Sequence, residues 1–218
     1  MKSNGIIFKQ ELSTNLSPDD ATTVDISRYQ NNGVNTNVSY TQLPSGVWVA
    51  EFNDSSSKVL ITQGEQYTSD YITMECWFKA TAPSAANVEL IDYEGWQAGG
   101  VKIEIARDAS TITAIIDVDG TERSTSGQAI TWGTIYYVVI TYDGNYIRLY
   151  LDGVIAKTSS NYAGTIGTPT KNLNLGWDGA SRWYNGWLAR ALLYNYALSA
   201  GAILNNYEKT KQLFRSGN

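Results

Sequence analysis

The sequence predicts an all-β fold, a sandwich or jelly roll made of two antiparallel sheets. Short segments rich in β-branched and aromatic residues recur at a spacing of roughly 8 to 12 residues, with Gly or Asp between them. The 19 Gly and only 4 Pro suit many tight turns, and 43% hydrophobic residues are enough for a core. At 218 residues the chain has a length that one all-β domain commonly reaches. We therefore expect a single domain over residues 1–218, with a short polar tail from about residue 209.

The clearest local pattern lies in residues 136–154, where three strand-like segments surround Asp143-Gly144 and Asp152-Gly153. Asp-Gly favours the primed turns that join antiparallel strands, because both central residues of a type I′ turn need positive φ. The segment therefore predicts a three-stranded meander, which we expect in the middle of one sheet.

The middle strand of this meander alternates between apolar and polar or amphipathic residues. Ile147, Leu149 and Leu151 fall on one face, which predicts that they point into a core. The intervening Tyr146, Arg148 and Tyr150 would line the opposite face, which is expected to be exposed and available for function.

The other expected strands follow the same composition, and they are sparse in the first 70 residues, which are rich in Asn, Ser, Thr and Asp. In chain order the expected strands are 5–9, 47–53, 72–80, 88–93, 101–106, 111–118, 136–142, 146–151, 154–158 and 173–175. One helix is expected near the end, because Ser199 is a good N-cap for residues 202–208.

These segments resemble, in order and spacing, the motifs of the laminin G-like group of concanavalin A-like domains. The matching residues are 24–33 (VDISRYQNNG), 51–54 (EFND), 72–79 (ITMECWFK), 141–144 (TYDG), 149–153 (LYLDG), 173–176 (LNLG), 184–189 (YNGWLA) and 193–199 (LYNYALS). The resemblance runs from about residue 24 to residue 214. It implies a concanavalin A-like jelly-roll sandwich with one short C-terminal helix.

The end of the chain carries a second resemblance. Residues 188–214 are similar to the ending of laminin G-like domains found in structural proteins of viruses and bacteriophages. That similarity implies a place on a capsid or tail.

Composition excludes several classes of function. The chain contains no His, so Ser-His-Asp and Cys-His catalysis and His-ligated zinc are ruled out. A net charge of -5, a pI of about 4.8 and the lack of a basic run argue against nucleic acid as a partner. We expect no membrane insertion and no signal peptide, because no segment is apolar enough for either. The single cysteine, Cys76, is expected to be a buried core thiol.

Glycoside hydrolysis stays open, since it needs only two carboxylates. Laminarinase-like families of this superfamily carry a Glu-x-Asp-x-x-Glu strand, and the nearest approach here is Glu89, Asp92 and Glu94. The spacing differs, and a period of two places Glu89 on the face opposite to the other two carboxylates. A hydrolase is therefore the less favoured alternative, and these groups are interpreted as solvated or hydrogen-bonded carboxylates at a strand end.

The resemblance also implies a calcium site, because laminin G-like sandwiches often bind Ca²⁺ through Asp carboxylates and loop carbonyls. The candidate ligands are Asp25, Asn32, Asn53 and Asp54. The late aspartate of the family falls on Ala189, which has no ligand atom. We therefore expect weak calcium binding or none, with Asx-turn hydrogen bonding as the alternative role, and no required cofactor.

Fifteen Tyr and seven Trp suggest a recognition surface. Trp96 lies in a Gly-rich loop, whereas Trp177 and Trp183 bracket a polar loop. An indole face packs on a sugar while polar neighbours bond its hydroxyl groups. The glycan-binding candidates are Trp96, Trp177, Asp178, Arg182, Trp183, Tyr184 and Asn185. Burial is the alternative for these rings, and core or sheet-face positions are expected for Trp48, Trp77, Trp132 and Trp187.

Together these features predict a non-catalytic, lectin-like recognition module that binds a cell-surface or polymeric glycan. The resemblance implies display on a virus particle, as a capsid or tail accessory protein used in adhesion and made in the host cytoplasm. A purely structural virion protein is the alternative. Its aromatic surface would contact other virion proteins, which predicts a homo-oligomer or capsid association without sugar binding.

Overall fold

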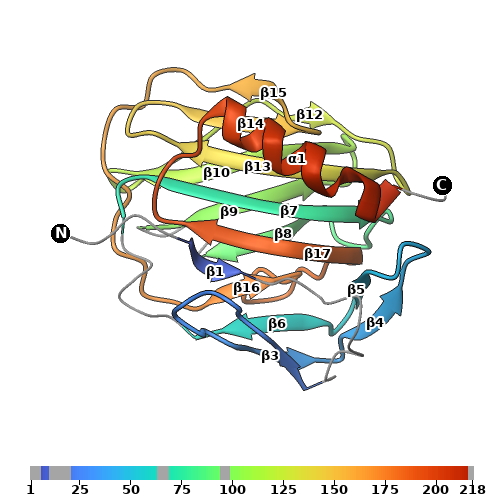
Figure 1. Cartoon of the computed structure of the whole chain (residues 1–218). Coiled ribbons are helices and arrows are strands. Elements are labelled where there is room, and N and C mark those ends of the chain that lie inside the picture. Colours follow the sequence, from blue (N-terminus) through green and yellow to red (C-terminus); the bar gives the residue numbers. More distant parts are fainter. Residues whose placement is uncertain (1–5, 10–20, 63–68, 94–98, 216–218) are drawn as a thin grey trace.

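The computed structural model describes residues 6–9, 21–62, 69–93 and 99–215, and for residues 6–9 only the backbone. Two antiparallel sheets pack face to face, and one helix lies across the outer face of one sheet (Figure 1). The eight-stranded sheet has the order β15 (Val154–Thr158), β14 (Ile147–Leu151), β13 (Ile135–Tyr142), β7 (Ile72–Ala80), β17 (Asn185–Tyr194), β5 (Trp48–Asn53) and β4 (Ser39–Gln42), with β1 (Ile6–Lys9) paired to β17. This arrangement confirms the predicted all-β sandwich.

The second sheet has nine strands. Its order is β11 (Thr121–Ser124), β10 (Thr111–Val118), β9 (Val101–Ala106), β8 (Asn87–Tyr93), β16 (Leu173–Leu175), β6 (Lys58–Ile61), β3 (Gly33–Thr36) and β2 (Thr22–Thr23), with β12 (Gln128–Ala129) paired to β10. The expected strands 101–106, 111–118 and 173–175 are confirmed residue for residue.

The core lies between the two sheets and is built from alternate residues of their strands. Ile147, Leu149 and Leu151 all join it, as the alternation in β14 predicts. Cys76 is fully buried there, and burial raises the pKa of its thiol, so the prediction of a core cysteine is confirmed.

The opposite face of the eight-stranded sheet is covered as well. Helix α1 (Ala200–Arg215) packs on it, and Ile203 and Phe214 from the helix join a second buried cluster with Trp77 and Tyr150 of the sheet. The prediction of an open face for Tyr150 is therefore wrong, because the C-terminal helix buries this residue.

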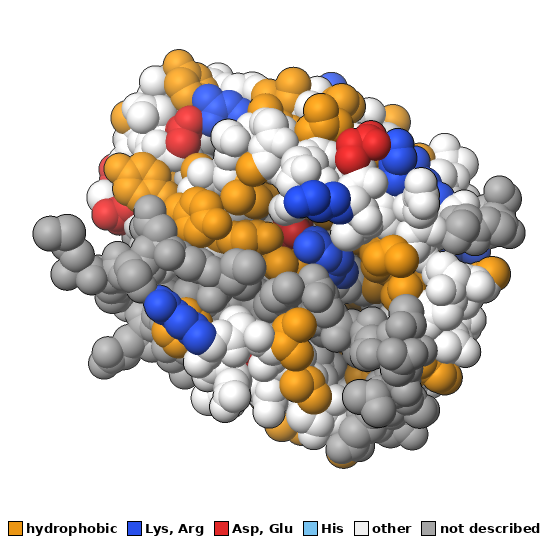
Figure 2. Space-filling view, in the orientation of Figure 1, with side chains coloured by type: hydrophobic (Ala, Val, Ile, Leu, Met, Phe, Trp, Pro, Cys, Tyr) orange, Lys and Arg blue, Asp and Glu red, His pale blue; other side chains and the backbone are white. Residues whose placement is uncertain are grey.

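The same packing explains why α1 extends well beyond residue 208. Ile203, Thr210 and Phe214 are buried at helical spacing, so the helix continues to Arg215 where a polar tail was expected from about residue 209. On the outward side of α1, Lys, Arg and acidic side chains lie beside hydrophobic ones (Figure 2). No helix in the described part of the chain is long and apolar enough to cross a membrane.

The meander of β13, β14 and β15 forms one end of the eight-stranded sheet, with β15 at its edge. Its predicted place in the middle of a sheet is wrong, because the sheet continues only beyond β13, through β7. Local hairpin signals define which strands pair within the meander, but they carry no information about the strands that pair with its outer edges.

The two Asp-Gly pairs of the meander form different turns. Asp152 and Gly153 both have positive φ, 53° and 82°, and Leu151 pairs with Val154, so this is the predicted primed turn. At the other pair only Gly144 has positive φ, and the Asp143 carboxylate accepts hydrogen bonds from the backbone N–H of the two residues after Gly144. The prediction of a primed turn is wrong there, because Asp143 stabilises a wider loop.

Gly153→Val is expected to destabilise the protein by roughly 1–3 kcal/mol, because a β-branched residue would be held at positive φ. A Cβ at Gly153 would also lie 3.0 Å from Leu204 Cδ1 of α1. Gly120→Val is the matched control, since Gly120 follows Asp119 in a turn of the same kind but has nothing within 4 Å of its Cβ position. Urea unfolding should show a larger loss for Gly153→Val than for Gly120→Val, and equal losses would mean that α1 does not press on this turn.

Candidate functional site

A continuous row of side chains crosses the outer face of the nine-stranded sheet. Leu60 pairs with Asn174, Asn174 with Asp92, and Asp92 with Lys102. Asn174 points away from the core because both of its neighbours on β16, Leu173 and Leu175, belong to the core. The register therefore brings β6, β16, β8 and β9 together under one surface, although β16 is far from the other three strands in the sequence.

A cluster of buried and partly buried ionisable side chains lies on and beside this row. Its members, here called the carboxylate cluster, are Glu89, Asp92, Lys102, Glu104, Asp178 and Arg182. Glu89 is 0% exposed, and its carboxylate oxygen Oε1 lies 2.9 Å from Arg182 Nη2 and 3.7 Å from Lys102 Nζ. Lys102 Nζ also lies 3.3 Å from Glu104 Oε2.

The structure corrects the predicted face of Glu89. A bulge interrupts the pairing of β8 with β9 between Glu89 and Ile91, so that Glu89 faces Glu104 while Asp92 faces Lys102. Since Lys102 and Glu104 are two residues apart on one strand, Glu89 and Asp92 share a face. Glu94, the third acidic residue of the hydrolase-like pattern, lies outside the described residues.

Burial has the largest effect on the pKa values of the carboxylates Glu89 and Asp92. It raises the pKa of Glu89 to about 8 even though Arg182 and Lys102 oppose the shift. It raises the pKa of Asp92 to about 7, against Lys102 and a hydrogen bond with Asn174. For Asp178, burial also pushes the pKa upward, but hydrogen bonds from Arg182 outweigh it, so the pKa lies below its ordinary value.

The loop 178–182 is organised by the Asp178 side chain. Its oxygen Oδ1 accepts hydrogen bonds from the backbone N–H of Ala180, Ser181 and Arg182, at 2.8 to 3.0 Å. Its other oxygen accepts one from Arg182 Nε at 2.8 Å. Asp178 therefore shapes the loop, and Arg182 connects it to Glu89 of β8 and Glu104 of β9.

The two ends of this loop bring a pair of indoles together. Trp177 and Trp183 form an isolated β-bridge, and their rings stack with centroids 5.5 Å apart. Both side chains are only partly buried. Lys58 of β6 reaches the pair, with its Nζ 3.8 Å from the centre of the Trp177 ring and 5.9 Å from that of Trp183.

A pocket of about 420 Å³ opens beside these indoles. Its lining includes Lys58, Leu60, Asn172, Asn174, Trp177 and Gly179. It combines an aromatic ring, two amides and an ammonium group, which is the mixture of apolar and convergent polar groups that ligand pockets use.

The remaining predicted glycan candidates stand elsewhere. Tyr184 is fully buried, packs edge-on against Phe52 and donates a hydrogen bond to the Trp187 carbonyl, so its assignment to the site is wrong. Asn185 opens β17 in the other sheet, where it pairs with Asn53. Trp96 lies outside the described residues.

Sequence reasoning missed Lys58, Leu60 and Asn174, the residues that strands β6 and β16 bring to the pocket. Strand β6 was not predicted, although its burial alternates from Lys58 to Ile61 as in a half-buried strand. The polar Asn174 between two leucines was a usable signal, because an isolated polar residue in a short apolar strand marks the face away from the core.

The candidate calcium ligands do not form one set. Asp25 and Asn32 lie near Gly33, where β3 begins, and Asp25 accepts hydrogen bonds from the backbone N–H of Ser27 and Asn31. Calcium binding by this loop stays a prediction, and the hydrogen bonds within it are those of an Asx turn.

The other two candidate ligands, Asn53 and Asp54, lie beyond the opposite end of β3. Asn53 accepts a hydrogen bond from the Ser57 backbone N–H, and Ser57 in turn contacts Asn37, which follows β3. Within the described residues no three Asp, Glu or Cys side chains gather as a metal site. Calcium binding by this second loop also stays a prediction.

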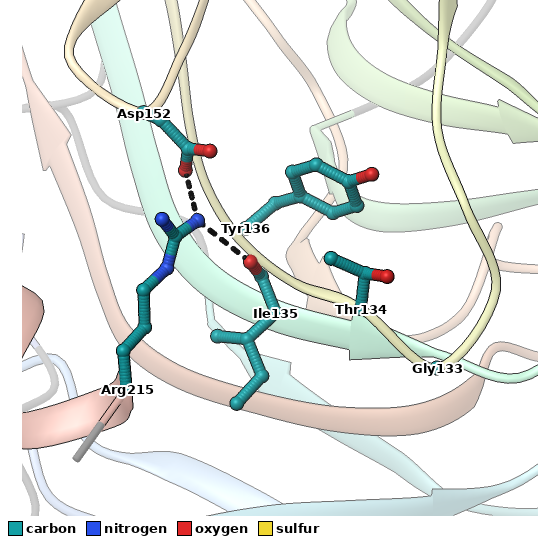
Figure 3. Close-up of a pocket in the computed structure, with 6 residues that line it drawn as sticks. All are labelled: Gly133, Thr134, Ile135, Tyr136, Asp152 and Arg215. Carbon is teal, nitrogen blue, oxygen red and sulfur yellow. Dashed lines mark hydrogen bonds and ion pairs between the residues drawn. The ribbon is translucent and has the colours of Figure 1, made fainter. Parts of the chain in front are cut away.

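A second pocket, of about 670 Å³, lies at the C-terminal end of α1 and contains none of the predicted site residues (Figure 3). Arg215 crosses it, and its Nη2 lies 2.7 Å from both Asp152 Oδ1 and the Ile135 carbonyl oxygen. Its guanidinium is thus committed to joining the helix to the β14–β15 turn and to β13.

Comparison with known proteins finds a matching family model and several solved structures that share the fold. The model of the family described as the concanavalin A-like lectin/glucanases superfamily matches residues 53–204. No curated protein sequence matches the chain.

Several solved structures share the fold at low sequence identity. The receptor-binding domain of botulinum neurotoxin D superposes with a TM-score of 0.74 at 17% identity, covering 94% of this chain and 52% of that one. Botulinum neurotoxin type C, whose cell entry depends on two ganglioside molecules, superposes with a TM-score of 0.71 at 15% identity. The match covers 94% of this chain and 51% of that one.

A sialidase of Trypanosoma rangeli bound to the inhibitor DANA is a further match, with a TM-score of 0.71 and 13% identity, covering 95% of this chain and 33% of that one. The chain thus spans about half the length of the toxin binding domains and a third of the sialidase.

Proposed function

The chain belongs to the concanavalin A-like lectin/glucanase superfamily, and from this we propose that it is a non-catalytic carbohydrate-recognition module whose site is the pocket beside Trp177 and Trp183. The observation that carries the proposal is the partly exposed indole pair, stacked at 5.5 Å beside a pocket with polar side chains. Sugars present an apolar C–H face and a rim of hydroxyl groups, so they need such a combination.

The structural neighbours support the choice of ligand class. The botulinum neurotoxin type C structure comes from a protein that interacts with gangliosides, which are glycolipids, and a related toxin binding domain is seen in complex with SialylT. Identities of 14 to 15% transfer the fold and not the site, so the proposal depends on the pocket of this chain.

Trp183→Ala is expected to abolish saccharide binding without unfolding the protein, because it removes half of the indole pair at the surface. Trp132→Ala is the matched control: Trp132 is also partly buried but packs against the core cluster and is not a member of the stacked indole pair. Binding is measured on a glycan array with multivalent protein and by tryptophan fluorescence titration, with circular dichroism as the check on folding. Single-site affinity should be weak, since a shallow pocket leaves little surplus after the costs of association.

Two results would contradict this proposal. The first is an array without any bound saccharide even for multivalent protein. The second is saccharide binding that Trp183→Ala leaves intact while Trp132→Ala removes it.

We also propose that the module is displayed on a virus particle as a capsid or tail accessory protein. The similarity of residues 188–214 to endings found in viral laminin G-like domains supports this. Many copies on one particle would convert weak single-site binding into firm attachment. Detection of the protein on purified particles, by antibody labelling, tests the proposal.

A hydrolase is the second candidate, favoured by one observation: Glu89 and Asp92 share a face beside the pocket and have raised pKa values. Both carboxylates are almost completely buried, at 0% and 2% exposure. A general acid or nucleophile must touch its substrate, so this arrangement favours recognition over catalysis. Release of reducing sugar from a bound glycan, lost in Glu89→Gln, would reverse the order of the two candidates.

A further inference from the structure

We infer that the pocket beside Trp177 selects acidic saccharides, meaning sugars that carry a carboxylate or a sulfate group. Lys58 is the residue that binds this acidic group. The inference rests on the proposed carbohydrate-binding function and adds the class of ligand. Among the described residues that line the pocket, two are charged, and both are lysines, Lys58 and Lys171. The pocket lining is thus positive although the protein has a net charge of -5.

The position of Lys58 is the first argument. If its ammonium group lay on the far side of Trp177 from Trp183, the distance to Trp183 would approach the sum of the other two distances. The observed distances of 3.8, 5.5 and 5.9 Å instead form a compact triangle. The ammonium group therefore stands beside both indoles, where a sugar that contacts the rings can reach it.

Among the described residues Lys58 has no anionic partner, and its ammonium group contacts the two indole rings instead. A cation–π contact fixes the place of an ammonium group but leaves its charge uncompensated. An anionic group on the ligand would supply the missing charge through a charge-assisted hydrogen bond.

Two further polar atoms at the pocket lack partners within the described residues. Asn174 is 5% exposed, and its Oδ1 accepts no hydrogen bond. The Trp177 Nε1–H donates none. An unmade hydrogen bond costs free energy when the group is buried, so a ligand with hydroxyl or amide groups would stabilise this wall of the pocket, provided that side chains shift enough to admit it.

The negative charge of the carboxylate cluster repels an anion in the pocket. This repulsion becomes weaker as the carboxylates are protonated. Asp92 is the cross-strand neighbour of Asn174, and the charged groups around it are Glu89 of β8, Lys102 and Glu104 of β9, and Asp178 and Arg182 of the loop 178–182. With pKa values of about 7 and 8, Asp92 and Glu89 lose negative charge as the pH falls toward 6. The affinity for acidic saccharides should therefore rise as the pH falls from about 8 to about 6.

The test compares lactose with 3′-sialyllactose and 3′-sulfolactose, which share a neutral core and differ in the acidic group. Isothermal titration should show about tenfold tighter binding of at least one acidic sugar. Lys58→Met keeps the apolar stem on the indoles and should reduce this preference to the level of lactose. Lys157→Met, on the edge strand β15 of the other sheet, is the matched control and should leave the preference unchanged.

Each outcome has one meaning. Preference for only the carboxylate or only the sulfate supports the inference and identifies the acidic group. Equal binding of all three sugars, or a preference that survives in Lys58→Met, overturns the inference and leaves the proposed carbohydrate binding in place. Absence of binding to these sugars and to every glycan of an array overturns both. Asp92→Asn should flatten the pH dependence, and a wild-type affinity that does not change with pH would refute the role of the carboxylate cluster.

Discussion

Glu75→Ala is expected to destabilise the protein by about 3–5 kcal/mol, because it removes a buried carboxylate that pairs with Arg190 and accepts four hydrogen bonds. Glu75 of β7 is 0% exposed. Its Oε1 accepts hydrogen bonds from Arg190 Nη1 at 2.7 Å and Tyr194 OH at 3.2 Å. Its Oε2 accepts them from Tyr137 OH at 2.6 Å and Asn206 Nδ2 at 3.2 Å.

The network matters because it joins four elements. Tyr137 comes from β13, Arg190 and Tyr194 from β17, and Asn206 from α1, so loss of the carboxylate loosens the helix from the sheet as well. Burial, reinforced by Glu75, raises the pKa of Tyr137, which keeps its hydroxyl protonated as a donor.

The measurement is urea unfolding followed by circular dichroism and tryptophan fluorescence. Asp108→Ala is the control, since Asp108 forms an exposed ion pair with Arg107 and should change the free energy of unfolding by less than about 1 kcal/mol. Glu75→Gln should fall between the two, because an amide keeps the volume and an acceptor oxygen but not the charge. A loss below about 1 kcal/mol for Glu75→Ala would show that the network contributes little.

Gly186→Ala is expected to be destabilising by at least about 3 kcal/mol, because backbone atoms occupy the place of a Cβ. Gly186 lies in β17 with φ of 131°, and an added Cβ would stand 2.0 Å from the Lys79 carbonyl oxygen and 3.1 Å from Ala80 Cα. Neither atom is a flexible side-chain end, so β17 would have to move away from β7.

Gly201→Ala is the matched control for this substitution. Gly201 lies in α1 with nothing within 4 Å of its Cβ position, so Ala should stabilise the helix by up to about 1 kcal/mol. Thermal unfolding of both variants separates the two effects, which have opposite signs. Unchanged or increased stability of Gly186→Ala would mean that β17 can shift at low cost. Because Gly186 lies three positions after Trp183, saccharide binding should be lost together with stability.

Local sequence patterns were enough to predict the fold class, most of the strands and one turn. Strands β7, β9, β10, β15 and β16 were predicted residue for residue, since period-two alternation and flanking turn residues are local signals. The Asp152-Gly153 turn was predicted for the same reason. Trp177, Asp178, Arg182 and Trp183 could be placed together from sequence because seven consecutive residues contain all four.

Local signals failed where a neighbour distant in sequence competed with them. Tyr150 alternates like a surface residue, but α1, about fifty positions later, covers it. The central strand β17 was not predicted as a strand, because Gly186 and the irregularity between Ala189 and Leu192 interrupt its alternation.

The composition of the candidate site depends on contacts between strands that are distant in the sequence. Glu89 stands beside Asp92 because a bulge in β8 moves Glu89 to the same face of the sheet. The residue types in β8 do not predict that bulge. Lys58, Asn174 and Trp177 meet because β6 pairs with β16, strands separated by more than 100 residues. The physical reason is that side-chain alternation specifies the face on which a residue stands, whereas cross-strand register, set by packing of the whole sandwich, specifies which residues of that face become neighbours.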